Sequence, residues 1–393
     1  MLILKNCRLI PVLTEGYDGE YADIAVENGI IRGIYPMGSV IDGTSLDMQG
    51  KTVLPGLFDL HMHLCFDTMD VEYMGQRGPE QSIVDGLSYA QDYLRNGYTF
   101  VRDCGMPHHA GQYIKQLIDK GIVDGPHYVC CGACNTPPSP GNALFGPVYN
   151  EFSGPEHAQA VVAEDLRNGA SFVKYMVTGA VMNDGADPQA MICSAEELKA
   201  MADAVKAQGT YLSCHVHGKP GILACLENDV YTLEHCTYLD EECIEKFLEK
   251  QGACVLIPTV GCLYGMARNL SGDVPEFMHQ KCNAIYETAV KMFGKAYRTG
   301  VTIGWGSDLD RPTFDMFPGL EFMGRAAMGL TNVELLKMAT IDSAKIMGVE
   351  HLTGSIKIGK WADFCVVDGK PDKDISVMYK LPAHVFKMGK QIA

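Results

Sequence analysis

Six side chains able to bind a metal ion stand at or near the ends of short apolar runs in this sequence. They are His61, His63, Lys174, His215, His235 and Asp308. His61 and His63 are two residues apart, so in an extended strand both imidazoles point to the same face and can reach one ion. Imidazole nitrogens and carboxylate oxygens are common protein ligands of zinc. If the apolar runs are strands whose ends meet, the sequence predicts a metal site there.

Each of these residues, taken alone, also has an ordinary structural interpretation. A His-X-His pair is common in apolar strands that bind no metal, and His235 could form a hydrogen bond within a core. Lys174 could bury its stem and extend its amine outward, and Asp308 could stabilise a turn or begin a helix. The metal interpretation therefore depends on whether the fold brings the six side chains together.

Apolar β-branched runs alternate with segments of helical periodicity between residues 53 and 308, which is typical of βα units around a parallel sheet. Eight runs are expected to be strands: Thr52–Leu60, Thr99–Cys104, Tyr128–Ala133, Phe172–Val177, Tyr211–His215, Val230–His235, Cys254–Val260 and Val301–Trp305. Candidate helices between them are Gln81–Arg95, Pro155–Arg167, Ser194–Gln208 and Asp240–Lys250. This α/β pattern predicts a (β/α)8 TIM barrel, whose active site lies at the carboxyl ends of the strands.

The two ends of the chain show short strands and turns instead of βα units. The expected strands are Leu2–Asn6, Asp23–Val26, Ile30–Tyr35, Gly354–Ile358, Phe364–Asp368 and His384–Lys387. Neither end supplies enough strands for a core of its own. We therefore expect residues 1–52 and 350–393 to form one small β-sandwich domain, beside a barrel domain of residues 53–349.

The composition favours an enzyme that acts on small molecules over a nucleic-acid binder. Asp and Glu number 48 against 32 Lys and Arg, a net charge of −16, whereas binding to polyphosphate depends on basic side chains. Many of the 15 cysteines lie in apolar runs, which indicates free thiols in a reducing compartment.

No run reaches the roughly 20 apolar residues of a membrane-spanning helix, and the first residues lack the pattern of a secretory signal. We therefore expect a cytoplasmic protein with a small-molecule substrate and with neither a nucleic-acid nor a membrane partner. We also expect a homo-oligomer.

The sequence resembles the amidohydrolase superfamily over essentially its whole length. The most specific segments are Leu54-Pro55-Gly56-Leu57-Phe58-Asp59-Leu60-His61-Met62-His63, Val173-Lys174-Tyr175-Met176, His215-Val216-His217-Gly218, Glu234-His235-Cys236 and Gly306-Ser307-Asp308. Within the superfamily it is most similar to the prolidase-like and basic-residue-releasing dipeptidases and carboxypeptidases, in which a lysine bridges two metal ions. The resemblance also implies the small β-sandwich beside the barrel.

The resemblance implies a role for Lys174 that an ordinary lysine cannot fill, because a cation with a pKa of about 10.4 repels a metal. Reaction with CO₂ would convert its amine to an anionic carbamate that bridges two divalent ions, with zinc the expected metal. One ion would be held by His61, His63 and Asp308, the other by the remaining two histidines, His215 and His235. A hydroxide between the ions would attack the amide carbonyl of a dipeptide or N-acyl amino acid. Asp308 would be the general base that passes the proton to the leaving amine.

Two loops depart from the pattern of the family, so the sequence defines the chemistry better than the substrate. Relatives carry a glycine- and histidine-rich loop after the third strand, where this chain has Ala133-Cys134-Asn135-Thr136. After the eighth strand it has Leu309-Asp310-Arg311 where relatives often continue Ala-Gly. The candidates for substrate contacts are His217, Tyr175, Tyr264 and Arg311. His217 could instead support a metal ligand, and the other three could be structural.

Two further functions stay open. Ring opening or deamination of a cyclic amide or imidazolone uses the same fold, but deaminases of the superfamily typically carry a glutamate shortly after the strand-five histidine. Here His215 is followed by Val216-His217-Gly218-Lys219. A scaffold without catalysis is the other possibility, but such proteins usually lose ligands, and all six are present in this chain.

Overall fold

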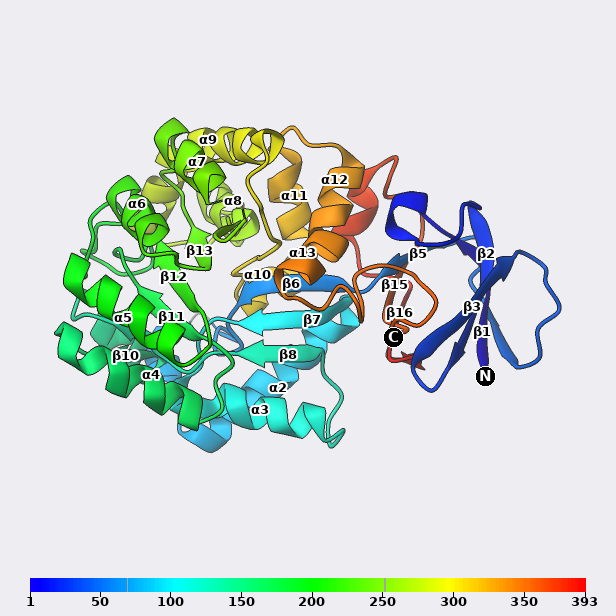
Figure 1. Cartoon of the computed structure of the whole chain (residues 1–393), viewed down its shortest axis with the longest axis horizontal. Helices are drawn as coiled ribbons and strands as arrows, with labels where there is room; N and C mark the ends of the chain where they lie inside the picture. Colours follow the sequence, from blue (N-terminus) through cyan, green and yellow to red (C-terminus); the bar gives the residue numbers. More distant parts are fainter. Residues whose placement is uncertain (69, 251) are drawn as a thin grey trace.

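Parallel strands occupy the centre of the larger part of the molecule, with helices around them (Figure 1). The computed structural model describes residues 1–68, 70–250 and 252–393. The central strands pair in the orders β6-β7-β8 and β10-β9-β11-β12-β13-β14. Their bounds are β6 Leu57–Met62, β7 Tyr98–Asp103, β8 His127–Cys130, β9 Cys134–Thr136, β10 Tyr149–Glu151, β11 Val173–Met176, β12 Leu212–Val216, β13 Thr232–His235 and β14 Val255–Ile257.

Backbone hydrogen bonds join these two sets of strands at both seams. At one seam the Ser171 amide donates to the Cys130 carbonyl at 2.8 Å, and at the other the Leu60 amide donates to the Trp305 carbonyl at 2.7 Å. The predicted eighth strand contributes a single β-bridge, from Ile303 to β14, where a regular strand was expected. The extended segment still closes the ring, so the central strands form the predicted α/β barrel.

Helices follow the strands and cover the outside of the barrel (Figure 1). They are α1 Val71–Gln76, α2 Pro79–Arg95, α3 Ala110–Asp119, α4 Ala158–Arg167, α5 Ala195–Ala207, α6 Lys219–Glu227, α7 Glu241–Glu249, α8 Val260–Arg268, α9 Glu276–Thr299, α10 Arg311–Met316, α11 Leu320–Ala326, α12 Asn332–Lys337 and α13 Ser343–Ile346. The start of α5 is a capping box, in which Ser194 accepts from the Glu197 amide at 3.1 Å and donates its own amide to the Glu197 carboxylate at 2.8 Å. Within the described residues, no helix combines the length and the apolar character that crossing a bilayer requires.

Both ends of the chain contribute to one sheet at the opposite end of the molecule, where the two termini also lie (Figure 1). The strand order is β17-β16-β15-β5-β1-β2-β3, with β4 paired to β1. The bounds are β1 Leu2–Arg8, β2 Tyr21–Glu27, β3 Ile30–Pro36, β4 Thr44–Asp47, β5 Thr52–Pro55, β15 Phe364–Val367, β16 His384–Lys387 and β17 Lys390–Gln391. The predicted strand Gly354–Ile358 is only a bridge between Ile356 and Thr14. The sheet has its own buried core, which includes Leu4, Ile24 and Phe364.

The run Thr52–Leu60, predicted as one strand, is two strands that belong to different sheets. β5 pairs with β15 in the terminal sheet, and β6 pairs with β7 in the barrel. Gly56 lies between them, where a Cβ atom would stand 1.9 Å from Thr99 Oγ1 and 2.7 Å from Thr99 Cβ. The chain can therefore pass from one sheet to the other only with a residue that has no side chain at this point.

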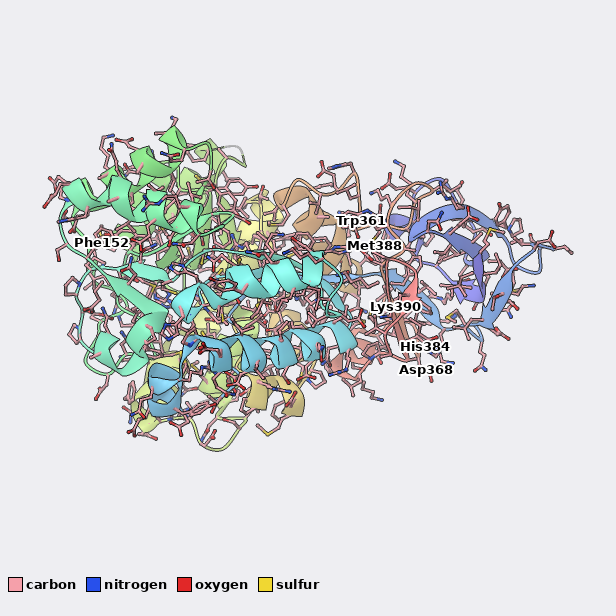
Figure 2. All side chains as sticks on the ribbon, turned by 90° about the horizontal axis from the view of Figure 1, so that it is seen from below. Phe152, Trp361, Asp368, His384, Met388 and Lys390 are labelled. Atoms are coloured by element: carbon pink, nitrogen blue, oxygen red, sulfur yellow. The ribbon has the colours of Figure 1, made fainter. Side chains whose placement is uncertain are left out.

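Contacts between the terminal sheet and the barrel surround His127 at the start of β8. Its Nε2 lies 2.9 Å from an oxygen of Asp363, and its ring stacks on Trp361 with 4.3 Å between centroids. The other Asp363 oxygen accepts from the Met388 amide at 2.8 Å. Figure 2 shows Trp361 and Met388 at this junction and Phe152 at the far end of the barrel.

Replacement of Gly56 by alanine is expected to lower the free energy of unfolding by about 1–3 kcal/mol, the typical cost of inserting a methyl group into a packed site. Thr99 cannot move aside, because its Cβ is held by the backbone of β7. Denaturant unfolding measures the effect. Gly78→Ala is the matched control, since the nearest atom to its added Cβ is the flexible Glu80 carboxylate at 3.6 Å. Equal losses in the two variants would contradict the expectation.

Candidate metal centre

The carboxyl ends of the barrel strands bring all six predicted ligands to one pocket. His61 lies in β6 and His63 just after it, Lys174 in β11, His215 in β12, His235 at the end of β13, and Asp308 after the segment that closes the barrel. All six side chains line the same pocket. This is the convergence on which the metal interpretation depended.

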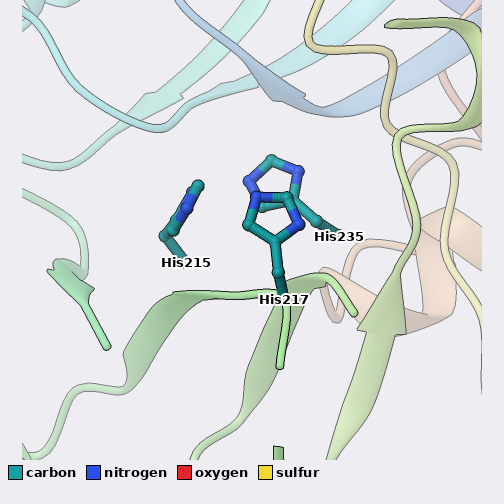
Figure 3. Close-up of side chains that lie close together, drawn as sticks. All are labelled: His215, His217 and His235. Carbon is teal, nitrogen blue, oxygen red and sulfur yellow. The ribbon is translucent and has the colours of Figure 1, made fainter. Parts of the chain in front are cut away.

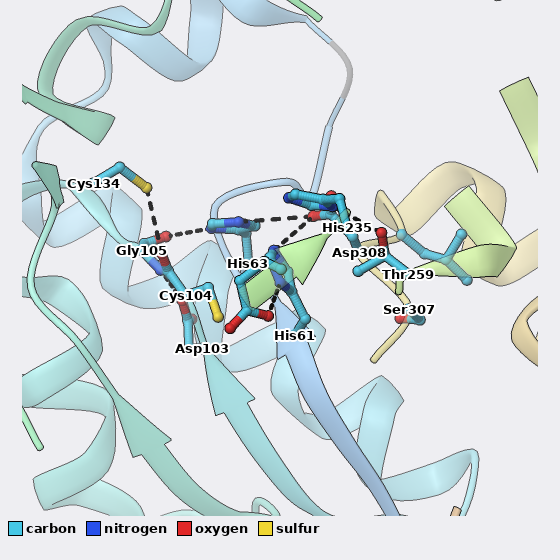
Figure 4. A network of polar contacts seen from close by, with 12 residues as sticks. His61, His63, Asp103, Cys104, Gly105, Cys134, His235, Thr259, Ser307 and Asp308 are labelled. Atoms are coloured by element: carbon cyan, nitrogen blue, oxygen red, sulfur yellow. Dashed lines mark hydrogen bonds and ion pairs between the residues drawn. The ribbon is translucent and has the colours of Figure 1, made fainter. Parts of the chain in front are cut away.

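His61, His63 and Asp308 form one group of possible ligands. The Nε2 atoms of the two histidines lie 3.6 and 3.7 Å from the same oxygen of Asp308. One ligand atom from each residue lies within 4.8 Å of the others. Figure 4 shows the three side chains pointing toward one another. The spacing suits three ligands of one ion.

A second group contains three histidines that converge from two neighbouring strands, His215, His217 and His235 (Figure 3). Their nitrogen atoms also lie within 4.8 Å of one another, and the rings of His215 and His235 have centroids 4.5 Å apart. His235 links the two groups, because its Nδ1 lies 3.9 Å from Asp308 Oδ2. His217, predicted as a substrate contact, thus stands among the possible ligands of the second ion.

Hydrogen bonds to Nδ1 orient several of these rings. His61 Nδ1 lies 2.7 Å from a Glu234 oxygen, and His63 Nδ1 donates to the Gly105 carbonyl at 3.0 Å. His235 Nδ1 lies 2.8 Å from the hydroxyl of Thr259. Metal-binding histidines are commonly held by such a partner on the other ring nitrogen. For His61 and His63 this leaves Nε2 to face Asp308.

Burial keeps the imidazoles neutral at ordinary pH. It lowers the pKa of His61, His215 and His235 well below the usual value, and together with Lys174 it lowers the pKa of His63 and His217 to about 3. A neutral imidazole keeps the lone pair that a metal requires.

The same burial raises the pKa of the Asp308 carboxyl group, whereas it lowers the pKa of the histidines. It raises the Asp308 pKa to about 8, against the opposing effect of the Lys174 charge. Burial also disfavours the cationic form of Lys174, but Cys104 and Glu234 outweigh it and raise the Lys174 pKa above its usual value. A divalent cation would favour the ionised form of Asp308 and the uncharged form of Lys174.

Four buried polar atoms in this site have no hydrogen-bond partner among the residues that the structure describes. They are His61 Nε2, Lys174 Nζ, His215 Nε2 and Asp308 Oδ1. A buried polar atom without a partner costs about 1–3 kcal/mol, so a cluster of four needs an explanation. A metal ion would supply the missing partner to the imidazole and carboxylate atoms. The donor set therefore fits divalent metal ions.

Glu234 belongs to this site, although it was predicted neither as a metal ligand nor as a substrate contact. One carboxylate oxygen accepts from Arg102 Nη2 at 2.7 Å and from the Ser213 hydroxyl at 2.7 Å, while the other lies against His61. Burial opposes its charge, but Arg102 and Lys174 outweigh burial and lower the Glu234 pKa. Glu234 precedes His235 in β13, and only the pairing of distant strands shows that it orients a ligand.

Three of the four predicted substrate contacts do not line the pocket. Tyr175 follows Lys174 in β11, so strand alternation turns it outward, where its ring lies 5.9 Å from that of Phe152. Tyr264 packs near Tyr286 on another face of α8, with centroids 5.6 Å apart. Arg311 forms an ion pair with Asp92 of α2. Of the four, only His217 is among the described residues that line the pocket.

The pocket above the ligands is mainly apolar and encloses about 950 Å³, its open mouth included. Its walls include Phe66, Phe145, Met176, Leu263, Met266 and Ile285. Lys281 of α9 is a charged exception. Sequence reasoning missed these residues, because apolar side chains of helices and loops have the same pattern in a core and in a pocket.

The sequence matches the amidohydrolase family over residues 52–392. The chain belongs to the amidohydrolase family. It is a hydrolase that acts on amide bonds, and its superfamily depends on metal ions. The predicted resemblance is thereby confirmed, and the groups of ligands at the barrel mouth are the candidate metal centre of this amidohydrolase.

Known relatives are similar over most of this amidohydrolase. It is 30% identical to ochratoxinase of Aspergillus niger over 366 residues, which cover 86% of this chain and 75% of the relative. It is 22% identical to imidazolonepropionase of Symbiobacterium thermophilum over 401 residues, covering 93% of this chain and 85% of that protein.

Solved structures share the same fold. The crystal structure of Aspergillus niger ochratoxinase has a TM-score of 0.81 at 26% identity and covers 99% of this chain and 95% of the other. That of a Xaa-Pro dipeptidase with bound methionine has a TM-score of 0.84 at 24% identity and covers 99% of both chains.

Glu234→Gln is expected to weaken metal binding about 10- to 100-fold, the usual cost of losing the group that orients a ligand. It should also lower the free energy of unfolding of the metal-free protein by about 3–5 kcal/mol, because Arg102 then loses its buried countercharge. Competition with a chelator measures the first effect and denaturant unfolding the second. Glu241→Gln is the control, since that residue forms an exposed ion pair with Lys295. Wild-type metal affinity and stability in Glu234→Gln would contradict the role of this carboxylate.

Proposed function

We propose that this amidohydrolase uses two metal ions to cleave the amide bond of a dipeptide or an N-acyl amino acid that carries a bulky apolar group. The observation that supports two ions is the presence of two groups of ligands in one pocket, linked by Asp308 and His235. Lys174 lines the same pocket as both groups, and its charge contributes to lowering the pKa of every histidine in them. The apolar walls support the bulky group.

In this proposal His61, His63 and Asp308 hold one ion, and His215 and His235 hold the other, with His217 beside them. Lys174, once converted by CO₂ to a carbamate, would contribute to holding both ions, because it would lose its positive charge and gain two oxygens that share one negative charge. Bound metal ions of this kind, with zinc as the proposed metal, make water nucleophilic at neutral pH and polarise a carbonyl.

Asp308 is the proposed general base. Its two oxygens lie within 3.9 Å of nitrogens from both groups of histidines, so it is placed where a proton from water can be accepted. The same carboxyl can then deliver the proton to the nitrogen that leaves. The apolar wall keeps bulk water away from this transfer, which strengthens the electrostatic interactions inside the pocket.

Cleavage of a linear amide is favoured over the two alternatives. Similarity to ochratoxinase reaches 30% identity, whereas two imidazolonepropionases are at 22% and 25%. No glutamate follows His215 closely, and Lys219 at that place forms ion pairs with Asp240 and Glu242 away from the pocket. A scaffold without catalysis would be expected to have lost ligands, and here all six converge.

The wild-type protein purified with zinc and bicarbonate is expected to contain two metal ions per chain. The Lys174→Met variant is expected to contain no more than one, because it lacks the carbamate oxygens. Elemental analysis gives the stoichiometry. Lys219→Met, at a lysine outside the pocket, should retain both ions. Two ions per chain in Lys174→Met would remove the bridging lysine from the proposal.

A library of dipeptides and N-acyl amino acids, assayed with zinc and bicarbonate, tests the proposed reaction. We expect hydrolysis to be fastest for members with bulky apolar groups. Turnover of cyclic imidazolones or deamination alone would favour the alternative enzyme, and no turnover by fully metallated protein would favour the scaffold.

On the best substrate, Asp308→Asn is expected to bind metal but to lose about 10²- to 10⁴-fold in kcat, the typical contribution of a general base. Steady-state kinetics and metal analysis measure the two properties. Asp315→Asn is the control, because Asp315 is exposed and pairs only loosely with Arg311. Near-normal turnover in Asp308→Asn would exclude it as the base.

A further inference from the structure

Lys281 places a positive charge in the apolar wall of the active-site pocket. It lies on α9, whose residues Lys281, Cys282 and Ile285 line the pocket together. Among the described residues that line this pocket, Lys174 is the other lysine, and it belongs to the metal centre. Outside the metal centre, Lys281 is the cationic side chain among the described residues that line the pocket.

Lys281 uses only part of its capacity to donate hydrogen bonds. Its Nζ donates to the Ala186 carbonyl at 3.0 Å and lies 5.4 Å from the centre of the Phe277 ring. An ammonium group has three donors, so two stay available for a ligand.

No carboxylate of the described residues lies within ion-pair distance of Lys281, although Lys295 on the same helix pairs with Glu241. The charge of Lys281 is therefore held in place by a carbonyl and an aromatic ring without being neutralised.

A neighbouring chamber carries the opposite charge. It shares Phe145 and Met266 with the active-site pocket, and its own walls include Asp184, Asp273 and Asp310. A negatively charged group would be repelled from this chamber and attracted to Lys281. The two chambers thus distinguish one end of an anionic substrate from the other.

We propose that Lys281 binds a free carboxylate of the substrate and so makes this enzyme select amides that carry one over uncharged amides. In dipeptides and N-acyl amino acids this is the carboxylate next to the nitrogen that leaves. The inference rests on the proposed function and adds the residue that recognises the substrate class. A charged hydrogen bond of this kind both orients the amide over the metal centre and adds binding energy.

A purely structural role for Lys281 has different consequences. The bond to Ala186 connects α9 to the loop after β11, so its loss could disturb the pocket for every substrate alike. Recognition of a carboxylate instead predicts that only substrates with that group are affected. Matched pairs of substrates therefore separate the two roles.

The test presents each amino acid derivative as the free acid and as the carboxamide, for example N-benzoyl-L-phenylalanine and N-benzoyl-L-phenylalaninamide, with benzoate release as the readout. The metal-loaded wild type should prefer the free acid. Lys281→Met should lose about 10- to 100-fold in kcat/KM on free acids, mainly through KM, which corresponds to one hydrogen bond to a charged group. Its activity on carboxamides should stay close to that of the wild type.

Lys281→Arg should recover part of the preference, because it restores the positive charge. Lys291→Met is the matched control, since Lys291 is exposed on the same helix. Equal losses on free acids and carboxamides in Lys281→Met would show a structural role and overturn the inference, as would a wild type that prefers carboxamides. Absence of hydrolysis throughout the library would overturn the proposed function itself, which is a separate outcome.

Discussion

The buried chain of contacts from Arg102 through Glu234 to His61 is the interaction on which the metal centre depends. A carboxylate without exposure to solvent is costly unless a cation and hydrogen bonds compensate it, and here Arg102 and Ser213 do so. The other oxygen of Glu234 then holds His61 so that its Nε2 faces Asp308. Arg102 lies in β7, Glu234 in β13 and His61 in β6. These three strands must therefore keep their register for the His61 Nε2 atom to face Asp308.

Burial also determines the chemical state of the ligands. It keeps the histidines neutral, with lone pairs that a metal can use, and it leaves buried nitrogen and oxygen atoms without partners. Such atoms weaken the metal-free fold, so part of the free energy of metal binding would relieve this cost. The side chains at the barrel mouth therefore favour the binding of cations. The same side chains affect both the stability of the metal-free fold and the binding of metal.

Different parts of the structure are responsible for chemistry and for selection of the substrate. The ligands come from strand ends, whose positions follow from the hydrogen-bonded register of the barrel. The walls above them come from loops and from α8 and α9, which are free to differ without disturbing that register. The apolar lining and Lys281 both belong to this second group.

The sequence by itself determined what depends on local periodicity. The two-residue spacing of His61 and His63 places both on one face of any strand, and the alternation of apolar runs predicted the barrel. The resemblance added the expectation that Lys174 bridges two metal ions. Only the tertiary structure decided that Arg311 pairs with Asp92, that β5 and β6 belong to different sheets, and that Lys281 and Glu234 reach the site. The physical reason is that the period of an element fixes the face on which a side chain stands, whereas the packing of distant segments decides what that face meets.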